Sequence, residues 1–427
     1  MNLAKILNLA KTPIALCALI AALALPAAAQ ADFGLVPGQT TATALARNGT
    51  IEEQASSHPA GFAVRFQLKA GSDGTTEGGE VREATVDLPP GLIGNPTAVP
   101  ACSRKDFVGT SPHCPADTQV GVLRAAIPVL GLLFAPVYNL TPPPGTPTMF
   151  GFSLFGKNVF QYASLRSESG YGLRVSSVDI PLELKEVTET IWGVPADPAN
   201  DGERFCRVGE SIAEPGCSST APLAPYLTLP ARCDAPLQTT VQVDSKLDPG
   251  NYVGETVESL DSGGNPSPLV GCDAVPFSPQ VASQPTSRSA TSPSGLEFQL
   301  KLPDEGLTNP DGIAETEPEK VEVTLPEGMT ANPSFAEGIS TCSEAQYAAE
   351  QLETPVGGGC PEASKLGSVE ARSPLLEEPI VGSLYLATPY QNRFGSLVAV
   401  YMVLRARERG VMIKQAGEVQ PDRSTGR

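Results

Sequence analysis

Apolar residues recur at every second position in two widely separated segments of the chain, 61–68 and 295–302. The apolar positions are Phe62, Val64, Phe66 and Leu68 in the first segment, and Leu296, Phe298, Leu300 and Leu302 in the second. A period of two is typical of a β-strand that buries one face and exposes the other. We therefore expect both segments to be half-buried strands.

These two strands open two copies of a longer pattern. In each copy a second short strand ends in a Pro-Gly turn, and Asn-Pro, Cys-Ser, Cys-Pro and Gly follow in the same order. The first copy reads Leu88-Pro89-Pro90-Gly91, Asn95-Pro96, Cys102-Ser103, Cys114-Pro115 and Gly121, and the second reads Leu325-Pro326-Glu327-Gly328, Asn332-Pro333, Cys342-Ser343, Cys360-Pro361 and Gly367. Self-similarity over this length predicts a tandem repeat. Ser103 and Ser343 have the spacing of helix caps, so we expect a short helical turn after each Cys-Ser pair.

Composition favours strands over helices. The 427 residues include 42 Pro and 41 Gly, and the interior of a long helix would be hard to sustain at that content. An apolar share of 41% is sufficient for packed cores. The short alternating segments, separated by turn residues, predict an all-β fold of tandem immunoglobulin-like β-sandwich modules, with disulfides inside each module and only short helical turns.

The first 31 residues are typical of a secretory signal peptide. Lys5 and Lys11 precede an apolar run at 14–25, and the small residues at 29–31 fit a cleavage site. We therefore expect a secreted protein without membrane insertion after cleavage, with association to the cell surface left open. The apolar stretch 127–137 is interrupted by prolines and predicts a buried strand, with a membrane-contacting patch as the alternative.

Export changes the interpretation of the nine cysteines. Cleavage removes Cys17 and leaves an even number in an oxidising compartment, which predicts disulfides. Equivalent positions in the two copies predict Cys102 with Cys114 and Cys342 with Cys360, and the remaining neighbours are Cys206 with Cys217 and Cys233 with Cys272. Metal binding is disfavoured because no C-x-x-C spacing occurs. We expect no metal and no cofactor.

The charge balance argues against nucleic acid as a partner. The chain has 29 Lys and Arg against 47 Asp and Glu, a net charge of −18, which would repel a polyanion. An acidic loop at Asp197, Asn200, Asp201 and Glu203 lacks the spacing of a calcium loop. We therefore expect a solvated loop there, with cation binding as the weaker alternative.

Candidate catalytic residues are scarce. The two histidines, His58 and His113, stand beside no nucleophile or metal motif, so we expect no catalytic site. A Ser-His-Asp triad or a carboxylate pair assembled from distant residues is left open. Trp192 is the only tryptophan, and packing in the core or a turn is favoured over a platform that stacks on carbohydrate.

These observations divide the chain into five parts. Residues 1–31 are the signal peptide, and 32–195 are the first β-sandwich repeat with a polar N-terminal segment. Residues 196–276 are a disulfide-containing β segment or small domain, and 277–294 are a linker rich in Ser and Pro. The second repeat covers 295–427 and is shorter than the first, which predicts a truncated longer repeat protein. The alternative is a partner strand that completes the second sheet.

A resemblance agrees with this organisation. Cys360-Pro361-Glu362-Ala363-Ser364-Lys365-Leu366-Gly367, Gly382-Ser383-Leu384-Tyr385 and Trp192-Gly193-Val194-Pro195 resemble a large group of uncharacterised secreted tandem-repeat proteins of high-GC Gram-positive soil bacteria. The group has no established activity, so the resemblance implies provenance and no catalytic residues. We expect a non-catalytic structural or adhesive protein whose modules act as spacers or binding surfaces. The alternative is a carbohydrate-binding or carbohydrate-active protein, so the partner would be an extracellular glycan or protein.

Overall fold

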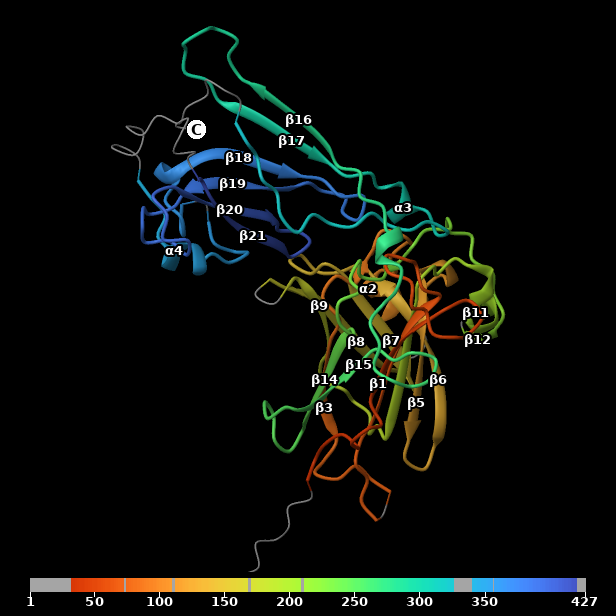
Figure 1. Cartoon of the computed structure of the whole chain (residues 1–427). Coiled ribbons are helices and arrows are strands. Elements are labelled where there is room, and N and C mark those ends of the chain that lie inside the picture. Colours follow the sequence, from red (N-terminus) through yellow and green to blue (C-terminus); the bar gives the residue numbers. More distant parts are fainter. Residues whose placement is uncertain are drawn as a thin grey trace, which may run out of the picture.

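A computed structural model describes residues 32–420 except 73, 110–111, 168–169, 209–210, 326–339 and 356. The signal peptide and the Pro-Gly and Asn-Pro residues of the second copy lie outside the described residues. The chain is built mainly from antiparallel strands with a few short helices (Figure 1), so the all-β prediction is confirmed. Immunoglobulin-like modules are not confirmed, because eleven strands belong to one sheet.

This large sheet combines strands that are far apart in the sequence. Its order is β1-β2-β10-β5-β6-β7-β8-β9-β3-β14-β15. The bounds are β1 Thr41–Leu45, β2 Gly61–Gln67, β3 Val81–Asp87, β5 Gln119–Ile127, β6 Gly131–Leu140, β7 Met149–Leu154, β8 Lys157–Arg166, β9 Gly172–Ser177, β10 Glu186–Trp192, β14 Gln238–Ser245 and β15 Val253–Glu258. Strands β14 and β15, from the segment 196–276, extend the same sheet through the pairing of β14 with β3.

The sheet rolls until its two edge strands meet. The backbone N–H of Gly38, just before β1, donates to the Glu255 carboxylate on β15 at 3.0 Å. A recess between the edges is lined by residues from both strands. Alternate side chains point inward and form one large core, to which β2 contributes Phe62 and Phe66. The result is a rolled sheet (Figure 1), and its interior is apolar.

A second, four-stranded sheet lies in the C-terminal part of the chain, in the order β18-β19-β20-β21 (Figure 1). Its strands are β18 Lys365–Ala371, β19 Ile380–Leu386, β20 Ala399–Ala406 and β21 Val411–Glu418. Helix α4 (Glu344–Ala348) packs on it by stacking Tyr347 against Tyr401, with ring centroids 4.2 Å apart. The hairpin of β16 (Gln280–Pro285) and β17 (Leu296–Lys301) pairs only with itself among the described residues.

The remaining elements are short. They are the strand pairs β4 (Ile93–Gly94) with β13 (Leu227–Thr228) and β11 (Phe205–Val208) with β12 (Ser211–Pro215), the helices α2 (Arg104–Phe107) and α3 (Glu305–Thr308), and the 3-10 turns η1 (Ala116–Thr118), η2 (Pro198–Glu203), η3 (Cys272–Ala274) and η5 (Glu362–Ser364).

Four disulfides join the cysteines of the described chain. The bonds are Cys102–Cys114, Cys206–Cys217, Cys233–Cys272 and Cys342–Cys360, the four pairs that the sequence predicts. Their Cα atoms lie between 4.9 and 6.1 Å apart, within the usual range for a disulfide. Each of the two Cys-Ser copies therefore carries its own bond.

The Cys-Ser corner is built in the same way in both sheets. The backbone of Cys102 donates to Asn139 O at 2.8 Å, and that of Cys342 donates to Leu386 O at 2.8 Å. Ser103 caps α2 and Ser343 caps α4, each by accepting from the N–H three residues later. An aromatic ring from each helix is then buried against the sheet. The expected helical turns are thus present at both corners.

The two sheets differ at one strand edge. In the first, β10 pairs with β5, and a Cβ added at Gly121 would lie 2.2 Å from the backbone oxygen of Thr190. In the second, β18 pairs only with β19 among the described residues, and a Cβ at the matching Gly367 would meet nothing within 4 Å. Correspondingly, Phe298 on β17 is 38% exposed. A partner strand that completes the second sheet remains a prediction for this edge.

This contrast gives a matched pair of substitutions. We expect Gly121→Ala to lower the free energy of unfolding by about 2 kcal/mol, because the new methyl group forces β10 away from β5. Gly367→Ala has open space around it and should change stability by less than about 0.5 kcal/mol. Urea unfolding of both variants tests this. Equal losses would show that β18 also has a close neighbour.

The apolar stretch 127–137 is only partly buried. The turn between β5 and β6 exposes Val129 and Leu130, and the first part of β6 exposes Leu132 and Phe134, whereas Ala135 and Val137 lie in the core. The prediction of a buried strand is therefore wrong for the first half of the stretch, because the β5–β6 hairpin extends past the region where other strands cover it (Figure 1). Among the described residues, no helix is both long and apolar enough to cross a membrane.

Candidate ligand cavity in the rolled sheet

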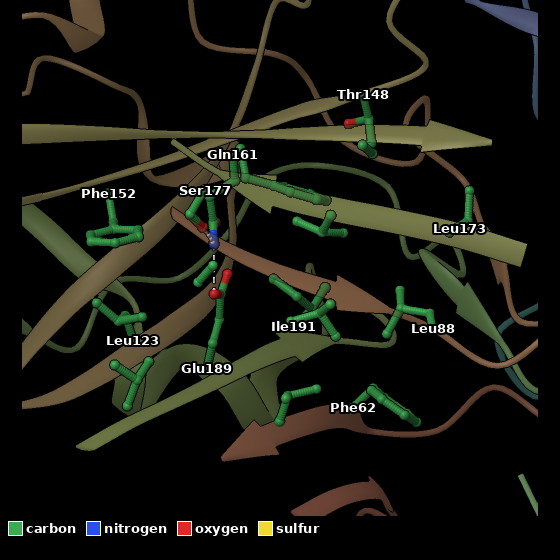
Figure 2. A pocket seen from close by; sticks show the side chains of 18 of the residues that line it. Phe62, Leu88, Leu123, Thr148, Phe152, Gln161, Leu173, Ser177, Glu189 and Ile191 are labelled. Atoms are coloured by element: carbon green, nitrogen blue, oxygen red, sulfur yellow. Dashed lines mark hydrogen bonds between the residues drawn. The ribbon is translucent and has the colours of Figure 1, made fainter. Parts of the chain in front are cut away.

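A cavity of about 150 Å³ lies inside the rolled sheet. Its walls are residues of seven strands of the rolled sheet, β2, β3, β5, β7, β8, β9 and β10, of the short pair β4 and β13, and of the connecting loops. Most of these side chains are aliphatic or aromatic, including Phe62, Leu123, Phe152 and Ile191, as Figure 2 shows. The cavity is therefore an apolar space with little polar wall.

One carboxylate faces this apolar space. Strand β10 alternates, so Val187, Glu189 and Ile191 line the cavity while the threonines between them do not. The strands on either side place Val64 and Leu123 directly opposite Glu189, and both are also cavity residues. The antiparallel register thus surrounds an acidic side chain with apolar neighbours.

Among the described residues, Glu189 has a single polar partner. Gln161 on β8 donates from Nε2 to Glu189 Oε2 at 2.7 Å and to Ser177 Oγ at 3.1 Å (Figure 2). The other amide atom, Gln161 Oε1, is buried and accepts no hydrogen bond within the described part of the chain. Since Gln161 is only 3% exposed, this acceptor is an unsatisfied group in the protein interior.

Burial dominates the acidity of this site. Removal from water raises the pKa of Glu189 from 4.5 to about 7, and the hydrogen bond from Gln161 opposes this with a smaller effect. No charged neighbour among the described residues contributes to this change in pKa. The carboxyl group therefore changes charge near neutral pH, with the cavity beside it.

A second hollow adjoins the cavity. It measures about 830 Å³ and lies between the rolled sheet and the loops of the C-terminal sheet, where Glu378, Glu408 and Arg409 line it. Pro96 and Thr148 line both the hollow and the cavity. These two residues therefore separate the apolar interior from the space between the two sheets.

The residues highlighted by the sequence lie elsewhere. Trp192 is 2% exposed and carries the Arg204 guanidinium over its ring, 5.1 Å from the ring centre. It is a core residue and has no free face for a sugar, in agreement with the favoured interpretation. The eight cysteines hold loops and corners together and line no part of the cavity.

The histidines are also apart from the cavity. His58 lies between two segments of backbone, with Nδ1 3.2 Å from Leu227 O and Nε2 2.8 Å from Gly306 O. His113 is exposed beside its disulfide. Neither histidine lines the cavity.

The acidic loop is held by arginines. Arg47 pairs with Asp197 at 3.3 Å and Arg204 with Asp201 at 3.5 Å, while Glu203 pairs with Arg124. Within the described ranges, no group of three or more His, Cys, Asp or Glu side chains could hold a metal ion.

Sequence reasoning missed Glu189 and Gln161. The available signal was a carboxylate on the apolar face of an alternating strand, between Val187 and Ile191. The strands that enclose this face are set by the order of strands in the sheet. The alternation of apolar and polar residues does not predict that order.

No protein family, curated protein or solved structure matches the chain.

Proposed function

We propose that the chain is an extracellular, non-catalytic binding protein whose rolled sheet holds a small apolar molecule. The observation that carries this proposal is the cavity, an apolar space of about 150 Å³ with a few polar groups in its wall, among them Glu189 and Gln161. Concave, mainly apolar sites with a few convergent polar groups are the usual form of small-molecule sites. Apolar cavities of roughly this volume stay dry and accept a single aromatic ring.

The disulfides support an extracellular setting for this function. All eight cysteines of the described chain are paired, and such bonds persist mainly in oxidising compartments. Secretion and cleavage of the leader belong to the proposal. The bonds would hold the loops and corners of the fold together outside the cell.

Filling the cavity tests the proposal. Toluene should bind the wild-type protein, and Ala163→Leu should weaken that binding at least about tenfold, because Ala163 is buried in the cavity wall. The neighbouring Ser164 is exposed on the same strand, so Ser164→Leu is the matched control and should bind normally. Isothermal titration calorimetry measures both, and thermal unfolding shows that the variants are folded. Unchanged affinity in Ala163→Leu would contradict the proposal.

A spacer or adhesive role is the second candidate. The observation that favours it is the shared Cys-Ser corner, which has the same hydrogen bonds and its own disulfide in each sheet. We propose that the two corners belong to copies of one repeated unit. Glycan binding depends on a different surface from Trp192, since that ring is buried. A screen of the mature chain against wall and plant glycans tests the adhesive role.

A further inference from the structure

We infer that the cavity selects a small apolar amine, with its ammonium group on Glu189 and its apolar body against the surrounding strands. This inference rests on the proposed function and specifies the class of ligand. It follows from the charge, the free hydrogen-bonding positions and the shape of the same cavity.

Charge is the first argument. An ionised carboxylate in apolar surroundings is costly unless a cation accompanies it. Glu189 has no such partner in the described chain, because its only polar contact is the amide of Gln161. A ligand that brings one positive charge supplies what the site lacks.

The hydrogen-bonding positions agree with a donor ligand. Gln161 Nε2, the amide donor, is already shared between Glu189 and Ser177. Beside Gln161 the position left for a ligand is an acceptor, the Glu189 oxygen that Gln161 does not contact. A primary ammonium group carries three donors and no acceptor, so it matches this position.

The rest of the wall restricts the body of the ligand. No Lys or Arg in the described part of the chain lines the cavity, so a ligand carboxylate or phosphate would find no counter-charge and would be repelled by Glu189. Phe62, Leu123, Phe152 and Ile191 lie around the carboxylate (Figure 2). These contacts favour an unsubstituted ring or short alkyl chain, and amino acids are disfavoured because of their second charge.

The protonation state of Glu189 makes the preference for an amine dependent on pH. Burial raises the pKa of its carboxyl group to about 7, so the group is neutral in mildly acidic solution and ionised in mildly alkaline solution. An ammonium ligand binds the ionised form best. Its affinity should rise by about tenfold between pH 6 and pH 8, while the affinity for a neutral ligand should stay constant.

The experiment compares benzylamine, benzyl alcohol and toluene on the full mature chain by calorimetry at pH 6 and pH 8. We expect benzylamine to bind wild-type protein at least about tenfold more tightly than benzyl alcohol at pH 8, and Glu189→Gln to abolish that preference. The pH dependence of benzylamine binding to wild-type protein tests the same point without a variant.

The outcomes separate the two proposals. Toluene or benzyl alcohol binding as tightly as benzylamine, with no dependence on pH, would overturn the amine inference and leave the proposed function standing. Benzylamine binding that is unchanged in Glu189→Gln would also overturn the inference. Failure of all three probes to bind would overturn both the inference and the proposed function.

Discussion

Glu189→Gln should raise the free energy of unfolding by roughly 3 kcal/mol at pH 8 and leave it nearly unchanged at pH 4. The reason is the pKa of Glu189, which burial raises from 4.5 to about 7 in the folded protein. Between these two values the folded state binds a proton that the unfolded state has released. The contribution of this carboxyl group to the stability of the wild-type protein is therefore largest below about pH 4.5. This contribution is lost as the pH rises through 7.

The size of the effect follows from the same two values. Each pH unit between them is worth about 1.4 kcal/mol, which gives the roughly 3 kcal/mol stated above. Glutamine has nearly the shape of glutamate and remains neutral, so Gln161 keeps a hydrogen-bonding partner at position 189. Urea unfolding of both proteins at pH 4, 6 and 8 measures the difference. A difference that does not change with pH would show that Glu189 is not desolvated in the folded protein.

The features that could be predicted from the sequence are the local ones. Alternation over 61–68 identifies β2, and the Cys-Ser segments identify the two helical corners, because a few neighbouring residues decide these structures. The disulfide pairs also followed from short separations and from equivalent positions. Each of these contacts has few alternative partners in the sequence.

The rolled sheet could not be predicted in this way. Strand β10 lies between β2 and β5, and β14 lies beside β3, although long stretches of sequence separate these partners. Alternation shows that a strand has a buried face and does not show which strands cover it. The cavity and its carboxylate depend on that order, so Glu189 was recognisable only after the partners of β10 were known.

The two glycines of the Cys-Pro segments show the same limit. Gly121 and Gly367 have matching positions in the sequence pattern. A Cβ added at Gly121 would clash with the backbone of β10, whereas a Cβ added at Gly367 would meet nothing within 4 Å among the described residues. A shared residue therefore does not imply a shared environment, because the environment comes from a strand outside the matched segment.

The largest loss of stability should come from the Cys233–Cys272 disulfide. This bond joins residues 39 positions apart, the longest loop among the four bonds of the described chain. Closing a longer loop removes more conformational entropy from the unfolded chain, and the chain-entropy relation gives about 4 kcal/mol for this length. The loop contains β14 and β15, which form one edge of the rolled sheet. We therefore expect Cys233→Ala with Cys272→Ala to lower the free energy of unfolding by about that amount.

The bond between Cys206 and Cys217 is the matched comparison. Its separation is 11 residues, for which the same relation gives about 3 kcal/mol, so its double alanine variant should be the more stable of the two. Urea unfolding of both double variants, each with the other three disulfides verified by mass spectrometry, measures the order. Strand β15 pairs with β14, which in turn pairs with β3. Loss of the Cys233–Cys272 bond should therefore make β15, at the edge of the sheet, the first strand to open. Faster hydrogen exchange in β15 than in β5 would show this, and equal exchange in the two strands would mean that pairing alone holds the edge.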